Sequence, residues 1–309
     1  MTDELQPRAF SVKFKRDPTF FACYPHPRFP VLSITGRECA LNCKHCGRRY
    51  LEHMRPCLTP DALFTTCAGL AENGARGVLL SGGYNDEGYL PFEPFLDAIE
   101  RVKRETGLFI SAHTGLVPSW LAHELGRVGL DLADFDLIGD DETIELVLGI
   151  DRTAEDYRQT MKVLKRSLPY VAPHICIGLH AGEIRGERKA LELAAEINPH
   201  ALVMLVLVPT PKTDFEHVAG PSPEAVGEII AEARVELPET TLTFGCMRPR
   251  DTRRDEFELQ ALRSGVDRVE LSSERTLEAA RKIGLQVRRL DTCCAVPNEL
   301  VEVATWSRW

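Results

Sequence analysis

The sequence predicts an α/β protein built as a closed (β/α)8 barrel of the TIM type. Three observations favour it: eight short β-rich runs, amphipathic helical stretches between them, and strands that are continuously apolar, such as LVMLVLV. Strands that are apolar on both faces are typical of a parallel sheet covered by helices. Eight strand and helix units over 309 residues fit a closed barrel better than an open doubly wound sheet, which is the alternative.

The predicted elements alternate along the chain. The strands are expected at 31–37, 77–83, 108–114, 133–138, 173–179, 201–208, 241–246 and 267–272. The helices are expected at 59–73, 94–105, 119–128, 153–167, 187–197, 223–236, 254–263 and 274–283. Several helical stretches begin at Thr, Ser or Pro and end near Gly, which suits helix starts and ends. We therefore predict an N-terminal extension at 1–30, the barrel at 31–284 and a C-terminal extension at 285–309.

Composition and charge narrow the classes of partner. The chain is 44% apolar and 27% charged, with a formal net charge of -9. A nucleic-acid-binding surface would need a basic stripe, so small molecules or proteins are the expected partners. The N-terminal residues MTDELQPRAF have no secretory-signal pattern, and the longest apolar run, 201–208, is too short to span a bilayer. We expect a cytoplasmic protein that binds neither nucleic acid nor membrane.

The stretch ECALNCKHCG places Cys39, Cys43 and Cys46 within eight residues, directly after the first predicted strand. In a reducing compartment, clustered thiols more often bind metal or do chemistry than form disulfides. Zinc would need a fourth ligand, which His45 or His53 can supply. A cubane iron–sulfur cluster held by three cysteines would leave one iron open for a substrate or cofactor. Three unrelated thiols are the remaining alternative.

Other cysteines follow later strands. Cys246 ends the seventh strand in TFGCMRPR, and Cys293 and Cys294 lie beyond the eighth strand in LDTCCAVP. Adjacent cysteines rarely bridge each other, so a vicinal pair favours a metal ligand or a redox thiol over a disulfide. Closure of the barrel would gather these three near its mouth, where we predict a second iron–sulfur cluster. Cys176, inside the fifth strand, is either a further ligand or a buried structural cysteine.

The remaining cysteines are expected to be packing residues. Cys67 lies in a helical pattern, and burial is favoured for Cys23 and Cys57 as well.

The C-x3-C-x2-C spacing after the first strand resembles the signature of the radical S-adenosylmethionine enzymes. The resemblance implies that Cys39, Cys43 and Cys46 bind a four-iron, four-sulfur cluster whose open iron chelates S-adenosylmethionine. It also implies reductive cleavage of that cofactor to a 5′-deoxyadenosyl radical, which abstracts a hydrogen atom from an unactivated carbon. The protein's own tasks would be to position the cofactor and to exclude quenchers.

The same resemblance implies further cofactor contacts. Gly82 and Gly83 match a Gly-Gly-Glu-like turn that meets the methionine amino group, although Tyr84 replaces the acidic residue. Asp136 and Asp140 are the alternatives for the ribose hydroxyls, since carboxylates accept both hydroxyl protons.

Two more positions follow from the family resemblance. Arg152 falls where similar enzymes pair an arginine with the methionine carboxylate. GLHAGEIRGE is similar to a Gly-x-Ile-x-Gly-x-x-Glu motif, with Ile184 beside adenine and Glu187 earlier than usual.

The longer pattern is similar to biotin synthase, through the cysteine in the fifth strand and LVPTPKTDFE after the sixth. FPVLSITGRECALNCKHC, YLEHM, GVLLSGGYNDEG, GCMRP and TCCA are closest to a related archaeal-type group that includes the two-protein lipoyl synthases. That resemblance implies sulfur insertion into an octanoyl chain on a lysine of a lipoyl carrier protein, with the second cluster as sulfur donor. It also implies an electron donor and a second related radical enzyme as partners.

Two alternatives stay open. One is another biotin-synthase-like radical enzyme that acts on a small molecule, by sulfur insertion or rearrangement. The other is a metal protein that carries electrons or has a structural role without cleaving a cofactor. An octanoyl chain on a lysine arm would need a narrow apolar tunnel. The basic residues Arg248, Arg250, Arg253 and Arg254 are either a contact for an acidic carrier or a solvated loop.

Overall fold

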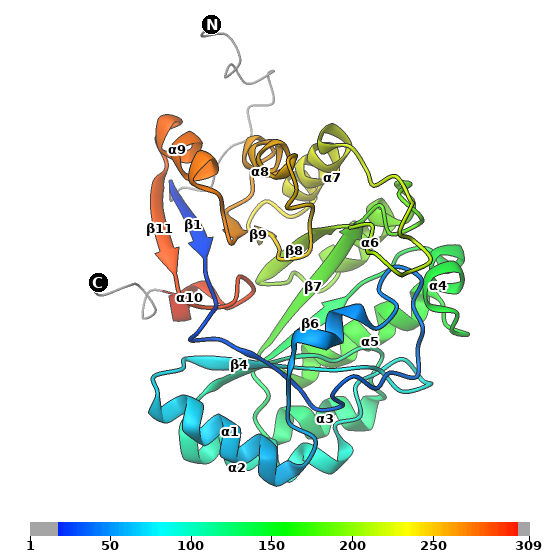
Figure 1. The fold of residues 1–309 in the computed structure, drawn as a ribbon, viewed down its shortest axis with the longest axis vertical. Helices are drawn as coiled ribbons and strands as arrows, with labels where there is room; N and C mark the ends of the chain where they lie inside the picture. Colours follow the sequence, from blue (N-terminus) through cyan, green and yellow to red (C-terminus); the bar gives the residue numbers. More distant parts are fainter. Residues whose placement is uncertain (1–17, 302–309) are drawn as a thin grey trace, which may run out of the picture.

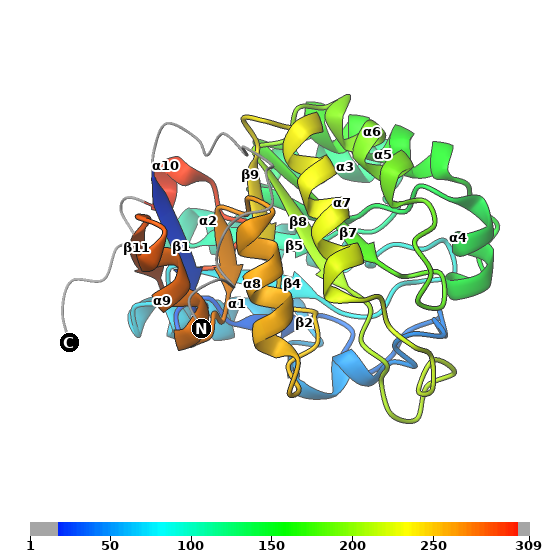
Figure 2. The same cartoon turned by 90° about the horizontal axis from the view of Figure 1, so that it is seen from above.

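The fold is a curled parallel β-sheet with helices around its outer face (Figures 1 and 2). It is seen in a computed structural model, which describes residues 18–301. Eleven strands form one sheet in the order β11-β1-β10-β9-β8-β7-β6-β5-β4-β2-β3. Every strand pair in it is parallel. None of the helices within 18–301 is long and apolar enough to cross a membrane.

The strands are short and mostly buried. They are β1 (Thr19–Cys23), β2 (Val31–Ser33), β3 (Arg55–Pro56), β4 (Gly77–Ser81), β5 (Phe109–His113), β6 (Leu132–Asp136), β7 (Tyr170–Ile177), β8 (Ala201–Val206), β9 (Thr241–Phe244), β10 (Arg268–Glu270) and β11 (Gln286–Leu290). All six residues of β8 are buried, as its continuous apolar run predicts. Each of the eight predicted strand ranges overlaps one of these strands, so the α/β class and the parallel sheet are confirmed.

The predicted closure into an eight-stranded barrel is not what the sheet shows. Its hydrogen-bonded order has two ends, β11 and β3, so the described sheet is a curled half-barrel of eleven strands. β1, β3 and β11 were not expected. β1 pairs with β10 on one side and with β11 on the other, so both predicted extensions contribute strands to this sheet. Residues 1–17 and 302–309 of those extensions lie outside the described residues.

The helices follow the predicted rhythm. They are α1 (Pro60–Glu72), α2 (Leu96–Thr106), α3 (Ser119–Arg127), α4 (Asp141–Leu148), α5 (Ala154–Ser167), α6 (Glu187–Ala195), α7 (Pro223–Glu236), α8 (Arg254–Arg263), α9 (Glu274–Lys282) and α10 (Asn298–Val301), with 3-10 turns at Arg49–His53 and Glu93–Phe95. Thr153 caps α5 in a capping box with Asp156. α4 and α10 were not predicted as helices.

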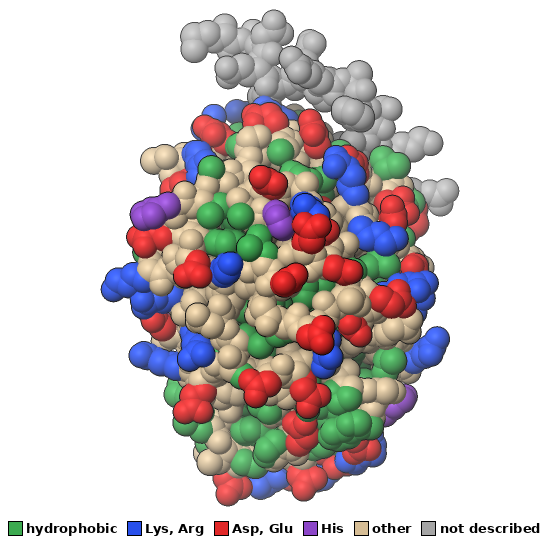
Figure 3. Space-filling model, turned by 90° about the vertical axis from the view of Figure 1, so that its right-hand side faces the viewer, with side chains coloured by type: hydrophobic (Ala, Val, Ile, Leu, Met, Phe, Trp, Pro, Cys, Tyr) green, Lys and Arg blue, Asp and Glu red, His purple; other side chains and the backbone are tan. Residues whose placement is uncertain are grey.

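The core lies between the sheet and these helices. Cys67 on α1 and Cys57 are fully buried in it, as predicted, and Cys23 is fully buried beside the C-terminal segment. Polar contacts hold that segment against the start of β4: buried Asp291 pairs with Arg76 at 2.8 Å and with Arg28 at 3.4 Å. The face in Figure 3 carries acidic and basic side chains interspersed with hydrophobic ones.

Candidate functional site

The loop that carries the first three cysteines follows β2 and is held by three separate parts of the chain. The backbone N–H of Ala40 donates to Tyr84 O at 2.8 Å, and that of Lys44 donates to the carbonyl of Val147 on α4 at 2.9 Å. The Lys44 carbonyl accepts from Phe215 N, after β8, at 3.2 Å. Because these contacts come from the ends of β4, β6 and β8, the loop lies across the carboxyl edge of the sheet, where parallel α/β folds place their sites.

Cys39, Cys43 and Cys46 all lie in this loop, and the thiols of Cys43 and Cys46 are in contact. Each is half-buried. Cys43 donates a hydrogen bond to Cys46, which raises the pKa of Cys43 and lowers that of Cys46. Burial raises the pKa of Cys39, and the charge of Cys46 acts on it in the same direction. One loop thus carries three thiols, two of which are in contact, and thiolates are the usual ligands of iron–sulfur centres.

The Gly-Gly turn after β4 is shaped by its contact with the cysteine loop. A Cβ atom on Gly83 would lie 2.1 Å from the Glu38 carbonyl oxygen and 2.3 Å from the Cβ of Cys39. Gly82 has a φ of +150°, a conformation that L side chains rarely adopt. The N–H of Gly83 donates to Thr35 Oγ1 at 2.7 Å. Glycine is therefore required here for the backbones to approach, and the turn lies directly against Cys39.

We expect Gly83→Ala to displace the cysteine loop and to lower both the free energy of unfolding, by about 1–3 kcal/mol, and the iron content after reconstitution. Gly69→Ala is the matched control, because a Cβ on Gly69 in α1 meets nothing within 4 Å. The free energy of unfolding of that control should rise by roughly 0.5–1 kcal/mol. Denaturant titration and iron analysis measure both effects. Unchanged iron in Gly83→Ala would contradict the proposed coupling between this turn and the cysteine loop.

Asp136, at the end of β6, is close to the first thiols, to the buried Tyr157 and to the half-buried Tyr84. Its side chain is exposed. Burial raises the pKa of Tyr84 and of Tyr157, and the charges of Asp136 and Cys43 add to both shifts. Burial lowers the pKa of His45, between two of the cysteines, to about 4, against the opposing charge of Asp136. The fold thus surrounds the thiols with an exposed carboxylate, two phenols and a neutral imidazole.

The other predicted ribose ligand, Asp140, is already engaged in the structure. It caps α4, where its Oδ2 accepts from Thr143 N at 2.9 Å, and it pairs with Arg185 at 3.0 Å. A Cβ on Gly186 would come within 2.6 Å of the Cβ of Asp140, which brings the GEIRGE segment against this cap. Ile184 in the same segment is half-buried against the core. Asp136 is the better placed of the two carboxylates.

Two residues of the predicted motifs have contacts of their own. Arg152 lines a cavity of about 280 Å³ that also includes Glu87 and Pro118, and it donates to the carbonyl of Asp151. Glu187 is buried, and its Oε1 accepts from Gly178 N at 2.7 Å, which ties the start of α6 to the end of β7.

The later cysteines form a second group with a residue that the sequence did not suggest. Glu270, Cys293 and Cys294 each offer one ligand atom, and these atoms lie within 4.8 Å of one another. Packing around the Cys246 thiol raises its pKa to about 12, and the charges of Glu270 and Cys293 act in the same direction. Two thiols and one carboxylate therefore meet, with the exposed Cys246 near them, and donors of these types can bind iron.

Tyr50 connects the two groups of thiols. Burial raises the pKa of Tyr50, and the charges of Cys176, Cys46 and Cys246 all add to the shift. Its hydroxyl is 3.0 Å from Thr210 Oγ1, in the loop after β8. Burial also raises the pKa of Cys176. Thiols from the first and the second group are thus both neighbours of one side chain at the carboxyl edge.

The segment that carries the vicinal cysteines is held by hydrogen bonds from β9 and β10. The fully buried Arg268 on β10 donates to the carbonyls of Cys294 at 2.8 Å and Val296 at 2.6 Å. Thr243 on β9 donates to the Cys294 carbonyl at 3.2 Å. These bonds involve backbone atoms, so they fix the segment independently of its thiol side chains.

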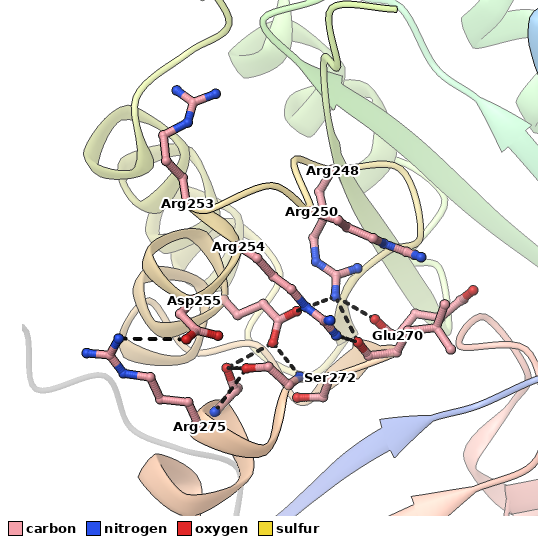
Figure 4. A network of polar contacts seen from close by, with 12 residues as sticks. Arg248, Arg250, Arg253, Arg254, Asp255, Glu270, Ser272 and Arg275 are labelled. Carbon is pink, nitrogen blue, oxygen red and sulfur yellow. Dashed lines mark hydrogen bonds and ion pairs between the residues drawn. The ribbon is translucent and has the colours of Figure 1, made fainter.

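Arg248, one of the arginines predicted to contact a carrier or solvent, is instead buried inside the fold. It donates to Glu258 Oε1 and to the carbonyl of Glu270, both at 2.6 Å. Figure 4 shows Arg248 within this network, whereas Arg253 points away from it. The prediction of a surface role is therefore wrong for Arg248, because its guanidinium neutralises a buried carboxylate.

We expect Arg248→Met to lower the free energy of unfolding by about 3–5 kcal/mol, because Glu258 would keep a buried charge with only Arg254 to balance it. Arg253→Met removes an exposed ion pair with Asp251 and should cost at most about 1 kcal/mol. Denaturant titration of both variants measures the difference. Equal stabilities would contradict a structural role for the Arg248 pair.

A buried polar row crosses four neighbouring strands. Ser81 Oγ lies 3.1 Å from His113 Nδ1, the rings of His113 and His174 meet edge to face at 5.9 Å, and His174 Nε2 is 3.9 Å from Asp134 Oδ1. Burial raises the pKa of Asp134. The charge of His174 also acts on Glu270. This row continues toward the second thiol group.

The residues that the sequence reasoning missed are separated from the cysteine motifs in the chain. Tyr157 lies on α5 and Glu270 ends β10, and neither belongs to a recognisable motif. The available signal for Glu270 was a carboxylate at the carboxyl end of a buried strand, a position where polar side chains are often functional.

The chain has a partial sequence similarity to one curated protein and shares its fold with several solved structures. No family model matches the chain. Biotin synthase of Prochlorococcus marinus is 26% identical over 184 residues, which are 58% of this chain and 53% of that protein. The match thus spans about half the length of this curated relative.

Among solved structures, methylornithine synthase has a TM-score of 0.62 at 16% identity and covers 88% of this chain and 84% of its own. The [FeFe]-hydrogenase maturase HydG of Carboxydothermus hydrogenoformans has the same TM-score at 15% identity, covering 88% of this chain and 68% of its own. SuiB of Streptococcus suis, bound to S-adenosylmethionine, has a TM-score of 0.55 at 13% identity and covers 74% of this chain and 52% of its own. At these identities the likeness shows the fold.

Proposed function

We propose that the chain is the sulfur-inserting component of a two-protein lipoyl synthase. Its substrate would be an octanoyl chain on a lysine of a lipoyl carrier protein, and its partners would be a second related radical enzyme and an electron donor. The observation that carries the proposal is the second donor group, Glu270, Cys293 and Cys294 with Cys246 nearby, beyond the first thiols in the same fold. Sulfur insertion needs a sulfur source near the radical, and a second cluster would provide it.

The first site is proposed to bind S-adenosylmethionine. Cys39, Cys43 and Cys46 would hold the cluster, which when loaded with S-adenosylmethionine supplies a 5′-deoxyadenosyl radical. Asp136 is exposed beside the thiols and can accept hydrogen bonds from two ribose hydroxyls. The turn at Gly82 and Gly83 places backbone atoms directly beside Cys39, where the methionine moiety is proposed to lie.

Other side chains would protect the reaction. Tyr84 and Tyr157 lie near the thiols, and burial raises the pKa of both phenols further above neutral pH. A site closed by such side chains excludes water and other quenchers from a reactive radical. Arg152 is not assigned to the cofactor on its present contacts, since it lines a cavity with Glu87 and Pro118.

The test is anaerobic reconstitution with iron and sulfide, followed by dithionite, S-adenosylmethionine and an octanoyl-lysyl peptide, with and without the second protein. We expect 5′-deoxyadenosine and a peptide whose mass has increased by sulfur. Mass spectrometry and chromatography measure the two products. Turnover of free octanoate, dethiobiotin or amino acids with none on the peptide would reject the lipoyl assignment, and absence of 5′-deoxyadenosine would favour a metal protein without radical chemistry.

One observation favours a second candidate, a radical enzyme for a small polar molecule. The buried row of Ser81, His113, Asp134 and His174 suits hydrogen-bonding groups better than a hydrocarbon chain, for which an apolar tunnel was expected. Asp134→Asn would then impair turnover of that small molecule. On the lipoyl proposal it should leave binding of the octanoyl chain largely unchanged, because the chain carries no group to meet a carboxylate.

A further inference from the structure

The carboxylate of Glu270 lies with the vicinal thiols inside the fold. Its ligand atom and those of Cys293 and Cys294 are all within 4.8 Å of one another. We propose that Glu270 is a metal ligand, the one oxygen donor among the cysteines that hold the auxiliary cluster. This inference rests on the second cluster of the proposed function and names its fourth ligand.

The strand β10 positions this carboxylate. Residues two apart on a strand project from the same face, so Arg268 and Glu270 extend to the same side of the sheet. Arg268 holds the carbonyl of Cys294, and Glu270 accepts a hydrogen bond from the Cys294 thiol. β10 is paired on both edges, with β9 and with β1. One rigid strand therefore fixes both the backbone of the cysteine segment and the carboxylate that faces its thiol.

The neighbouring arginines balance the negative charge of Glu270 only in part, because their guanidinium groups donate hydrogen bonds to other acceptors. Glu270 is 7% exposed. The guanidinium of Arg248 is bound to Glu258 and to the backbone carbonyl of Glu270, and Arg250 donates to the carbonyl of Cys246. A buried carboxylate is stable when it is paired or coordinates a metal. Iron bound at this place would balance the carboxylate and the adjacent thiolates together.

A carboxylate changes what the metal site can do. Oxygen donors are harder ligands than thiolates, so an iron bound by Glu270 would differ from irons bound only by sulfur. Glu270, Cys293 and Cys294 supply three ligands, and the nearby Cys246 would complete the four that common iron–sulfur clusters need. The cluster would therefore have one chemically distinct iron, which spectroscopy can detect without any turnover.

The test uses the full chain with Cys39, Cys43 and Cys46 all changed to alanine, so that the remaining iron reports the second site alone. After anaerobic reconstitution this background should hold one cluster, and its Mössbauer spectrum should contain an iron site distinct from thiolate-bound iron. Adding Glu270→Gln should remove most of the iron and sulfide, whereas Glu270→Cys should retain them and lose the distinct site. Full iron and an unchanged spectrum in Glu270→Gln would overturn the proposal.

Controls separate ligand loss from misfolding and from failure of the proposed function. Cys23→Ala alters a buried cysteine beside this group but outside the ligand set, and it should keep the iron. If circular dichroism shows that Glu270→Gln does not fold, the Mössbauer spectrum of the variant that lacks only Cys39, Cys43 and Cys46 tests the proposal instead. Iron bound only by thiolates, or no iron, in that variant would overturn the proposal. A different result is that the triple cysteine variant shows the distinct iron site while the wild-type chain leaves the octanoyl-lysyl peptide unmodified. That result would support Glu270 as a metal ligand and reject the lipoyl assignment.

Discussion

Cys43→Ala is expected to abolish cleavage of S-adenosylmethionine, with 5′-deoxyadenosine falling to the background level. Cys43 lies between the other two thiols in the chain and shares a hydrogen bond with Cys46, so its loss leaves two ligands for a cluster that needs three. The iron content should fall by roughly a half to two thirds, since the auxiliary cluster would remain. Chromatographic detection of 5′-deoxyadenosine and iron analysis after anaerobic reconstitution measure both effects.

Cys67→Ala is the matched control for this variant. Cys67 is fully buried in α1 and belongs to the hydrophobic core, away from both groups of clustered thiols. Its replacement should cost about 1 kcal/mol of stability through lost packing while iron and 5′-deoxyadenosine stay at the wild-type level. Substantial cofactor cleavage by Cys43→Ala would remove the basis for a cluster held by the first three cysteines.

The parts of the fold that the sequence predicted are those whose side-chain pattern reflects burial on both faces. β8 is buried throughout, so its apolar run is unambiguous. β11, by contrast, reads QVRRL and is largely exposed, because it forms one end of the sheet. α4 was missed because its first turn is acidic, so the segment resembled a loop of candidate ligands rather than a helix start capped by Asp140.

The residues of the candidate site also fall into those that the sequence predicted and those that it did not. Cys39, Cys43 and Cys46 are close in the chain, so a local motif was enough to predict a shared site, within which Cys43 and Cys46 are in contact. Glu270 and Cys294 are separated by a helix and a strand, and their contact depends on how β10 and the C-terminal segment pack. The burial of Arg248 could not be predicted from the sequence. An arginine-rich stretch does not reveal which guanidinium pairs with a buried carboxylate.

Cys294→Ala is expected to separate the two proposed clusters. It removes a buried thiol of the second donor group and should lower the iron content by roughly a third to a half, depending on cluster size. The first three cysteines are untouched, so 5′-deoxyadenosine should still form while sulfur transfer to the octanoyl-lysyl peptide stops. The protein should remain folded, because Arg268 and Thr243 bind the carbonyl of residue 294 rather than its side chain.

Cys23→Ala again provides the control for this experiment, since it changes a cysteine packed against Cys294 without removing a proposed ligand. Cys23 and Cys294 belong to the same group of buried, packed side chains, and each variant removes one sulfur atom from it. A general loss of packing in this region would therefore affect both variants alike. Iron analysis, 5′-deoxyadenosine formation and peptide mass are measured for both. Full iron and full sulfur transfer in Cys294→Ala would mean that the sulfur comes from elsewhere, whereas equal losses in both variants would trace the effect to packing rather than to metal ligation.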